Sequence, residues 1–372
     1  MSVFSDSEIL SVARYGEAGP GPHALGLAIP LVIARSTALG ARSGLLVRSR
    51  QAFEDVRRVD TVVFDKTGTL TEGRFGVVEV APVPPLERDE LLAAAAAVEA
   101  SSEHPIARAI ARAASAQPRP AEQFRSLPGA GAEALVDGRL IAVVSPEHAA
   151  AAGAPISEID RARLSADGRT VVAVISDGIA IGAIALADTV RPEAAEAVRS
   201  LQGLGVSSVL LSGDVRAASQ RVADELGIER VFAEVHPAEK AAVIGRLQAE
   251  GATVAMVGDG VNDAPALVSA DVGIAIGAGA DVAIESADIV LVRSDPRAVV
   301  CSIELSRATY AKMLQNLWWA VGYNVVAIPL AAGVLSGVGI VLGPAVGAAL
   351  MSASTVIVAL NAQLLRVSSP VS

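Results

Sequence analysis

The sequence predicts an α/β protein in which a parallel sheet carries an inserted second domain and about three helices cross a membrane. Helix-like and strand-like stretches alternate from Asp188 to Ile276, as expected for a parallel sheet wrapped by helices. A domain-sized segment of different character, residues 72–187, interrupts this pattern. Hydrophobic residues make up 52% of the 372-residue chain and the mean hydropathy is +0.49. This composition is too apolar for a purely soluble enzyme and indicates membrane spans.

Changes in composition along the chain set the expected domain limits. We expect an unassigned lead-in (1–21), a transmembrane helix (22–46), a parallel-sheet domain (51–71 and 188–296), an inserted domain (72–187), a polar linker helix (298–314) and a two-helix transmembrane hairpin (316–366). Arg42, Arg48 and Arg50 mark the cytoplasmic exit of the first span. Arg307 and Lys312 precede the apolar pair and Arg366 follows its last apolar residue, which places both ends of the hairpin on the cytoplasmic side. For residues 22–46 a buried helix of a soluble domain is the alternative.

Charge and cysteine content exclude some function classes. The chain has 40 acidic and 30 basic residues, a formal charge of -10, and no basic run interleaved with aromatic residues. Nucleic acid is therefore not an expected partner. Cys301 is the only cysteine, so no disulfide can form within the chain, which fits a cytosol-facing protein without a Cys-rich metal-binding module.

One stretch carries the strongest chemical indication. The apolar run Val62-Val63-Phe64 ends at Asp65, and Lys66-Thr67-Gly68-Thr69-Leu70-Thr71 follows. A buried strand that delivers one aspartate to a loop at the sheet edge supplies a candidate covalent nucleophile toward phosphate. Lys66 could hold an anion, and Gly68 would let the backbone approach a phosphate. The alternative is an ordinary strand end followed by a polar turn.

Three further groups follow predicted strands or begin helices, and we expect them near Asp65. They are Ser212-Gly213-Asp214, Lys240, and the Gly-rich turn from Gly258 to Asp263. Together with Asp65 they supply a nucleophile, a hydroxyl and a lysine for phosphate oxygens, and hard oxygen ligands for Mg²⁺. Each piece alone is weak, since a Gly-Asp-Gly turn is often only a turn.

In this order, the set resembles the haloacid-dehalogenase-like phosphotransfer core. The strings DKTGTLT and GDGVNDAPAL narrow the resemblance to the P-type ATPases. The resemblance implies that 51–71 and 188–296 form the phosphorylation domain and that Asp65 becomes an aspartyl phosphate during ATP hydrolysis. It also implies site roles for further residues: a Mg²⁺ site of Asp65, Thr67, Asp259 and Asp263, support from Asn262, and phosphate contacts from Lys66, Thr67, Ser212, Gly213, Asp214 and Lys240. Ser212 stands where the family usually has threonine, and this change keeps the hydroxyl.

By the same resemblance, residues 72–187 form the nucleotide-binding domain. Ser102-Glu103-His104-Pro105 resembles a motif of the heavy-metal branch, in which Glu103 and His104 would meet the adenine. Gly129 and Gly131 match that branch's GxG turn, where close approach of ATP to the backbone requires the absence of a side chain. The alternative for His104 is a histidine that begins a helix.

Polar residues in the apolar stretches are the candidates for an ion path, because polar groups within spans are costly. These candidates are Asn316, Tyr323, Asn324, Met351 and Ser354, with His23 on the first span. A thioether beside hydroxyl and amide groups suits a soft cation such as copper, although a methionine in a span is ordinarily packing. The spacings resemble the copper-associated branch that carries a Cys-Pro-His motif. Here that motif reads Gly21-Pro22-His23, so the thiolate is missing.

These patterns predict the catalytic half of a copper-type heavy-metal P-type ATPase that uses ATP and Mg²⁺. We expect it in the plasma (inner) membrane with its catalytic domains in the cytoplasm. The family's earlier spans and actuator domain have no counterpart in this sequence. We therefore expect no transport by this chain alone, and a separate chain as a candidate source of those parts. A membrane-tethered phosphohydrolase that transports nothing and a non-enzymatic remnant are the alternatives.

Overall fold

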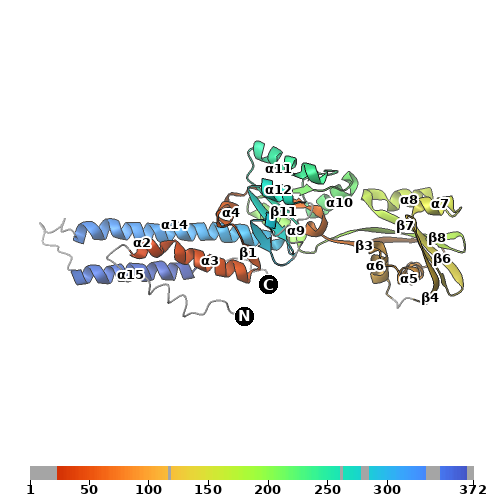
Figure 1. Cartoon of the computed structure of the whole chain (residues 1–372), viewed down its shortest axis with the longest axis horizontal. Helices are drawn as coiled ribbons and strands as arrows, with labels where there is room; N and C mark the ends of the chain where they lie inside the picture. Colours follow the sequence, from red (N-terminus) through yellow and green to blue (C-terminus); the bar gives the residue numbers. More distant parts are fainter. Residues whose placement is uncertain (1–22, 116–118, 260–262, 278–284, 332–343, 367–372) are drawn as a thin grey trace. The chain divides into compact units, whose positions relative to one another are not determined.

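The structure is a computed structural model that describes residues 23–115, 119–259, 263–277, 285–331 and 344–366 (Figure 1). The chain divides into two compact units. One unit comprises Val59–Ala287 and Arg293–Arg297. The other comprises Met1–Arg58, Asp288–Val292 and Ala298–Ser372.

The first unit contains a parallel sheet with strand order β12-β11-β2-β9-β10. The strands are β2 (Thr61–Asp65), β9 (Ser207–Leu211), β10 (Arg230–Phe232), β11 (Val254–Gly258) and β12 (Val272–Ile276). The connecting helices are α9 (Ala194–Gly203), α10 (Arg216–Leu226), η4 (Pro237–Glu239), α11 (Lys240–Ala249) and α12 (Ala264–Ser269). Every residue of β2 is buried, because β2 lies in the middle of the sheet with apolar side chains of α11 and α12 against it. The predicted parallel sheet wrapped by helices is therefore present.

The inserted domain is a six-stranded antiparallel sheet with strand order β3-β8-β7-β6-β5-β4. Its strands are β3 (Thr71–Pro82), β4 (Ala121–Leu127), β5 (Gly131–Val136), β6 (Arg139–Val144), β7 (Thr170–Ser176) and β8 (Ile179–Val190). Its helices are α5 (Arg88–Glu99), α6 (Pro105–Ala113), α7 (Pro146–Ala151), α8 (Glu158–Leu164) and the short η3 (Ala166–Gly168). The paired long strands β3 and β8 are the two chain connections between the domains. The sequence did not predict β3, β4 or β5.

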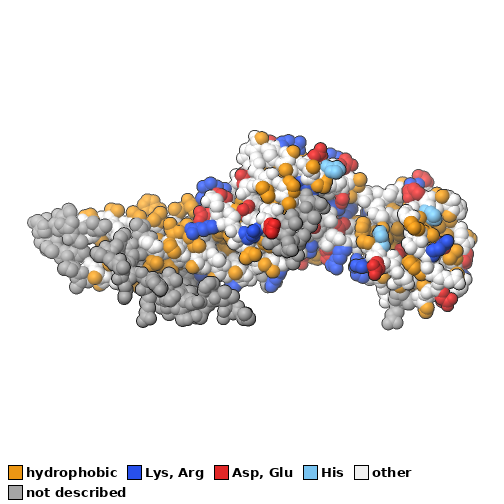
Figure 2. All heavy atoms as spheres, viewed as in Figure 1, with side chains coloured by type: hydrophobic (Ala, Val, Ile, Leu, Met, Phe, Trp, Pro, Cys, Tyr) orange, Lys and Arg blue, Asp and Glu red, His pale blue; other side chains and the backbone are white. Residues whose placement is uncertain are grey.

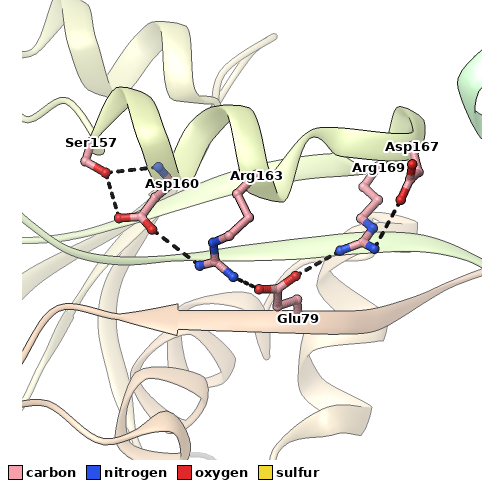
Figure 3. A network of polar contacts seen from close by, with 6 residues as sticks. All are labelled: Glu79, Ser157, Asp160, Arg163, Asp167 and Arg169. Atoms are coloured by element: carbon pink, nitrogen blue, oxygen red, sulfur yellow. Dashed lines mark hydrogen bonds and ion pairs between the residues drawn. The ribbon is translucent and has the colours of Figure 1, made fainter.

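A network of ion pairs fixes α8 and η3 to the sheet of the inserted domain (Figure 3). Glu79 of β3 accepts a hydrogen bond from Arg163 of α8 and another, at 2.9 Å, from Arg169. Each arginine has a second carboxylate partner, Asp160 at 3.3 Å and Asp167 at 3.4 Å, respectively. Because all five side chains are at least partly exposed, we regard this network as a fastening of surface elements that contributes little to stability.

The second unit is mainly helical. It contains α2 (His23–Ala28), α3 (Pro30–Arg42), α4 (Arg50–Asp55), η1 (Val56–Arg58), α14 (Arg297–Ala331) and α15 (Pro344–Gln363), and β1 (Leu45–Val47) pairs with β13 (Ile289–Leu291). Ala28, Ala320 and Val358 form a small fully buried cluster where α2, α14 and α15 meet. The buried amide of Asn316 donates to the backbone carbonyls of Ala28 (3.1 Å) and Val358 (3.3 Å).

The helical unit differs from the sequence prediction at two places. Residues 22–46 do not form one continuous helix. Instead α2 ends before Pro30, α3 ends at Arg42, and Leu45–Val47 is a strand. The break has a physical reason, since Pro30 lacks the N–H that would continue α2. The expected linker helix 298–314 is not separate either, because α14 runs unbroken from Arg297 to Ala331.

Apolar side chains are unusually exposed on α14 and α15. Trp318 is 75% exposed, Val325 66% and Leu360 61%. Figure 2 shows hydrophobic side chains gathered along these helices. Among the described residues α15 alone, over Val346–Gln363, is both long and apolar enough to cross a membrane. The predicted hairpin 316–366 includes residues 332–343, which lie outside the described residues. The hairpin therefore stays a prediction.

Candidate active site

Asp65 is the last residue of β2, and the ends of the neighbouring strands lie beside it. In the sheet register Asp65 is paired with Leu211 of β9, and Phe64 is paired with Val257 of β11. Ser212 and Asp259 directly follow these two strands. The predicted convergence on the carboxyl edge of the sheet is therefore observed for these groups. Asn262, predicted to support the site, lies outside the described residues.

Lys240 joins two acidic groups of the site. Its Nζ donates to Asp65 Oδ1 at 2.5 Å and to Asp263 Oδ1 at 2.6 Å. All three side chains are at least nine-tenths buried. The position of Lys240 at the start of α11 and of Asp263 just before α12 makes this contact possible, although the three residues are far apart in sequence.

Burial dominates the electrostatics of this cluster. The pKa of Asp65 is raised to about 7: loss of solvent is the largest cause, the Asp263 charge acts in the same direction, and Lys240 acts to lower it. Burial also acts to lower the pKa of the Lys240 ammonium, but the two carboxylates outweigh this effect and raise it. Lys240 therefore stays charged, and a further cation would be needed to keep Asp65 fully ionised at neutral pH.

Lys66 points to a different set of carboxylates. Its buried ammonium pairs with Asp214 and lies 4.0 Å from Asp188 Oδ2. Asp188 also accepts hydrogen bonds from Thr71 Oγ1 (2.5 Å) and from the backbone N–H of Arg74 (3.0 Å). These contacts hold the Asp188 carboxylate in place beside the loop that follows Asp65. Sequence reasoning missed it, because nothing in its local pattern sets it apart.

Arg191 is a second residue that the sequence did not reveal. Its guanidinium donates to the carbonyls of Gly68 (2.9 Å) and Thr69 (3.0 Å), and so holds the loop that follows Asp65. Gly68 has φ +76°, and a Cβ there would lie 2.7 Å from Asp259 Oδ2. Glycine is required at this position both by backbone conformation and by the close approach of Asp259.

The donor set around Asp65 fits Mg²⁺. Within the part of the chain that the structure describes, no group of three or more His, Cys, Asp and Glu side chains is arranged for a metal. Mg²⁺ does not need one, since it commonly takes one or two carboxylates and completes its shell with waters and substrate phosphates. The tight placement of Asp259 against Gly68 brings a second carboxylate to the Asp65 loop, and the Asp259 charge acts on Asp65.

Comparison with known proteins identifies the family. Residues 59–271, more than half of the chain, match the haloacid dehalogenase-like hydrolases. The catalytic domain of the CPx-ATPase CopB-B, a solved structure, is 31% identical with a TM-score of 0.53, and the match covers 70% of this chain and 96% of that domain. The chain belongs to the haloacid dehalogenase-like hydrolases. Within them it is a P-type ATPase chain.

Longer relatives extend the similarity into the helical unit. The copper-exporting P-type ATPase B of Archaeoglobus fulgidus is 57% identical over 348 residues, which are 93% of this chain and 50% of that protein. The copper-exporting P-type ATPase B of Enterococcus hirae is 43% identical over 349 residues, again 93% of this chain but 47% of that protein. A crystal structure of a zinc-transporting PIB-type ATPase matches 92% of this chain and 55% of its own, with 38% identity and a TM-score of 0.83. The chain therefore spans about half the length of the curated relatives that it matches.

The inserted domain of this P-type ATPase chain carries the residues predicted for nucleotide binding. His104 is exposed and caps α6, since its Nδ1 accepts a hydrogen bond from the N–H of Ile106 (3.3 Å). Glu103 is exposed as well. Both Gly129 and Gly131 have positive φ. A Cβ at Gly131 would collide with the Val143 carbonyl, so strand pairing by itself explains this glycine.

Glu99 is a second carboxyl near this motif, beside Glu103, and sequence reasoning missed it. It is the last residue of α5 and only 6% exposed, whereas Glu103 is exposed. Burial raises the pKa of Glu99 to about 6, and a hydrogen bond with Ser102 acts in the opposite direction. A carboxyl whose pKa is strongly raised by burial is a candidate for a functional position. Its place at the end of a helix with many alanines gave no signal in the sequence.

The transported-ion candidates in the helical unit differ in burial and in hydrogen bonding. Asn316 is fully buried, and its amide oxygen accepts a hydrogen bond from Asn361 Nδ2 (2.8 Å) in addition to its two bonds to backbone carbonyls. These contacts join α14 to α2 and α15 through Asn316. Tyr323 donates weakly to the Gly347 carbonyl (3.4 Å), and Ser354 is 7% exposed. Asn324 and Met351 are partly exposed, and the His23 side chain lies outside the described residues, as do Gly21 and Pro22.

Proposed function

We propose that this chain is the catalytic half of a copper-type heavy-metal ATPase and that ATP phosphorylates Asp65. The observation that carries the proposal is the buried Asp65–Lys240–Asp263 cluster at the carboxyl edge of the sheet. In the proposed reaction a carboxylate oxygen of Asp65 attacks the γ-phosphorus, the bond to the β–γ bridging oxygen breaks, and ADP leaves with that oxygen. Lys240 holds Oδ1, so attack through the other oxygen keeps this contact.

The surrounding residues have separate proposed roles. Lys66 and Ser212 would contact the transferred phosphoryl group, and Arg191 holds the loop carbonyls in place. Asp65, Asp259 and the Thr67 carbonyl would hold Mg²⁺, with Asp263 close by. The metal would supply positive charge to the phosphate oxygens and lower the pKa of Asp65.

The inserted domain would hold the nucleotide. Because His104 Nδ1 accepts from the α6 backbone, the neutral imidazole carries its proton on Nε2. That N–H is a donor suited to an acceptor nitrogen of adenine. Glu103, Gly129 and Gly131 stay in the proposed site, and Glu99 is added to it on the strength of its burial.

Phosphorylation of the full chain in detergent micelles by [γ-³²P]ATP tests the proposal. We expect an acid-stable, hydroxylamine-sensitive label that Asp65→Asn abolishes. His104→Ala should weaken ATP binding about tenfold, the value of one lost hydrogen bond with a well-placed partner. His148→Ala is the matched control, since His148 is an exposed histidine in the first turn of α7. A wild-type chain that takes up no label would refute both catalytic interpretations and leave a non-enzymatic remnant.

One observation favours a second candidate, a membrane-tethered phosphohydrolase without transport. Asn316, one of the predicted ion ligands, has its amide engaged in helix packing. We propose that this chain takes part in export of a soft cation, copper by similarity, only in an arrangement like that of the longer relatives. In that arrangement another chain or segment supplies the remaining spans and the actuator. Cu⁺ or Ag⁺ that stimulates phosphorylation of this chain supports the transport-coupled interpretation, and labelling that is indifferent to metal supports the phosphohydrolase. Zn²⁺ belongs in the same comparison because a solved relative transports zinc.

We also propose that α14 and α15 lie in a membrane, with the inserted and parallel-sheet domains in the cytoplasm. The exposed apolar side chains of both helices support this placement, as does the length of α15. Retention of the full chain in phosphatidylcholine nanodiscs tests it.

A further inference from the structure

The helical unit contains a cavity that shares no residue with the site around Asp65. It has a volume of about 230 Å³ and lies among α3, α4, η1 and α14. Its lining is basic, with Arg48, Arg50 and Arg57 and a single acidic residue, Glu54. Glu54 accepts a hydrogen bond from Arg50 Nε at 3.2 Å. Three guanidinium groups against one carboxylate give the cavity an excess of positive charge.

Two polar atoms of the lining are buried without a hydrogen-bond partner among the described residues. One is Nε of Arg57 and the other is Oγ1 of Thr309, whose side chain is only 6% exposed. Buried polar groups in folded proteins are normally hydrogen-bonded, and each unsatisfied group is costly. Arg57 and Thr309 belong to different elements, η1 and α14, and both line the cavity. Acceptor oxygens of a ligand in the cavity would supply the missing partners of these groups.

Arg57 is held in place before any ligand arrives. Its Cζ lies 3.8 Å from the centroid of the Tyr310 ring, so the guanidinium plane is packed on an aromatic face. A guanidinium held in this way loses little conformational freedom when it binds a phosphate. The tyrosine itself also lines the cavity.

The position of the cavity along α14 corresponds to the headgroup level of a bilayer. Its α14 residues run from Leu305 to Met313, and the exposed pair Trp318 and Trp319 follows. Exposed tryptophans mark the membrane interface. With a rise of about 1.5 Å per residue, Met313 lies about 7 Å and Leu305 about 20 Å from Trp318 along the helix. Both lie on the side of Trp318 that is away from the apolar stretch. Figure 2 shows basic side chains gathered at the α4 end of these helices.

We propose that this cavity binds the phosphate headgroup of an anionic phospholipid. Arg57 Nε and Thr309 Oγ1 would donate to phosphate oxygens, while the apolar lining residues Ile33, Leu305 and Met313 would contact the first carbons of the lipid. This apolar part of the wall favours a lipid over free phosphate. The choline ammonium of a zwitterionic lipid would meet the positive lining unfavourably. The inference rests on the membrane placement proposed above, and it adds a ligand-binding site distinct from the ATP site.

Native mass spectrometry of the full chain released from nanodiscs tests the inference, with phosphatidylglycerol and phosphatidylcholine as the two lipids. We expect the wild-type chain to retain phosphatidylglycerol about tenfold more tightly than phosphatidylcholine. Arg57→Gln should remove most of this preference, and Thr309→Val should reduce it about threefold to tenfold. Arg58→Gln is the matched control, because Arg58 loses the same charge one residue away and does not line the cavity. It should change the preference less than twofold.

Three outcomes overturn the inference. Equal retention of both lipids by the wild type means that water alone fills the cavity. An equal loss in Arg58→Gln and Arg57→Gln means a diffuse electrostatic attraction and not a site. Displacement of phosphatidylglycerol by millimolar inorganic phosphate means that a soluble phosphate compound is the ligand. If Arg57→Gln fails to fold, Thr309→Val decides, since it removes only a hydroxyl. Failure of the chain to enter phosphatidylcholine nanodiscs refutes the membrane placement instead, so the two failures are distinguishable.

Discussion

Replacement of Lys240 by methionine is the perturbation for which the structure gives the clearest magnitude. The ammonium contacts carboxylate oxygens of Asp65 at 2.5 Å and of Asp263 at 2.6 Å. With an effective dielectric constant of about 20, each contact contributes roughly 6 to 7 kcal/mol of Coulomb energy. Desolvation of the three ions offsets most of this gain. The loss of one partner from a buried pair nevertheless costs about 3 to 5 kcal/mol, because an uncompensated buried charge remains.

Hydrogen exchange of the β2 amides measures this loss where it occurs. We expect protection over Thr61–Asp65 to fall about 100-fold or more in Lys240→Met, since 1.4 kcal/mol corresponds to a factor of about ten. Lys240→Met combined with Asp263→Asn should recover part of the protection, because one carboxylate is then neutral. Neither variant should form phosphoenzyme. Arg246→Met, which removes an exposed cation from the same helix, is the control.

Protection of β2 in Lys240→Met that equals protection in the Arg246→Met control would refute the reasoning. It would mean that the three side chains do not share a buried ion cluster in the folded chain. A large loss that the second substitution does not relieve would also count against it. In that case the packing of the lysine methylenes, and not the unpaired carboxylates, would be the cause.

Three other outcomes are expected. Gly68→Ala should reduce phosphoenzyme formation at least about 100-fold, because its Cβ would displace Asp259; Gly138→Ala has a similar positive φ with open space around it and should lose only about 1 kcal/mol of stability. Glu99→Gln should raise the stability of the chain at pH 7.5 by about 1 kcal/mol and change it little at pH 4.5. The pKa of Glu99 is raised from its ordinary value of 4.5 to about 6, so ionised Glu99 destabilises the fold, and this effect appears as pH rises through that range. Thermal melts of both proteins between pH 4.5 and 7.5 will show the difference. Asn316→Ala should weaken helix packing by about 1 to 2 kcal/mol by hydrogen exchange and leave Ag⁺ affinity within about twofold by calorimetry.

The active site could be predicted from sequence wherever a residue follows a strand of the parallel sheet. Asp65, Ser212 and Asp259 all follow buried β-branched or apolar runs, and the register of a parallel sheet brings such ends to one edge. Lys240 was found by its motif, but its contact with Asp263 could not be. That contact depends on where two helices start, and the start of a helix is the feature that a sequence pattern defines least well.

The residues that were missed share a physical reason. Asp188 and Arg191 lie where the chain returns from the inserted domain; Asp188 accepts from the Thr71 hydroxyl and the Arg74 N–H, and Arg191 donates to loop carbonyls. Contacts of a side chain to a distant backbone carbonyl leave no pattern in the local sequence. Glu99 was missed for a different reason: burial distinguishes it from Glu103, and burial at the end of a short alanine-rich helix depends on what packs against it.

The apolar stretches show where a pattern is ambiguous in principle. A polar residue in a membrane helix is costly whether it lines an ion path or ties two helices together, so its rarity cannot tell the two apart. In the structure the hydrogen bonds of Asn316 go to the α2 and α15 backbones and to Asn361. Met351 is not engaged in the same way: no hydrogen bond to its sulfur is found among the described residues. We propose that Met351 stays a candidate soft-metal ligand and that Asn316 instead holds the helices together. The measurement that tests this is metal-stimulated phosphorylation of Asp65. Stimulation that is lost on substitution of Met351 but kept on substitution of Asn316 would show that phosphorylation responds to an ion bound at Met351.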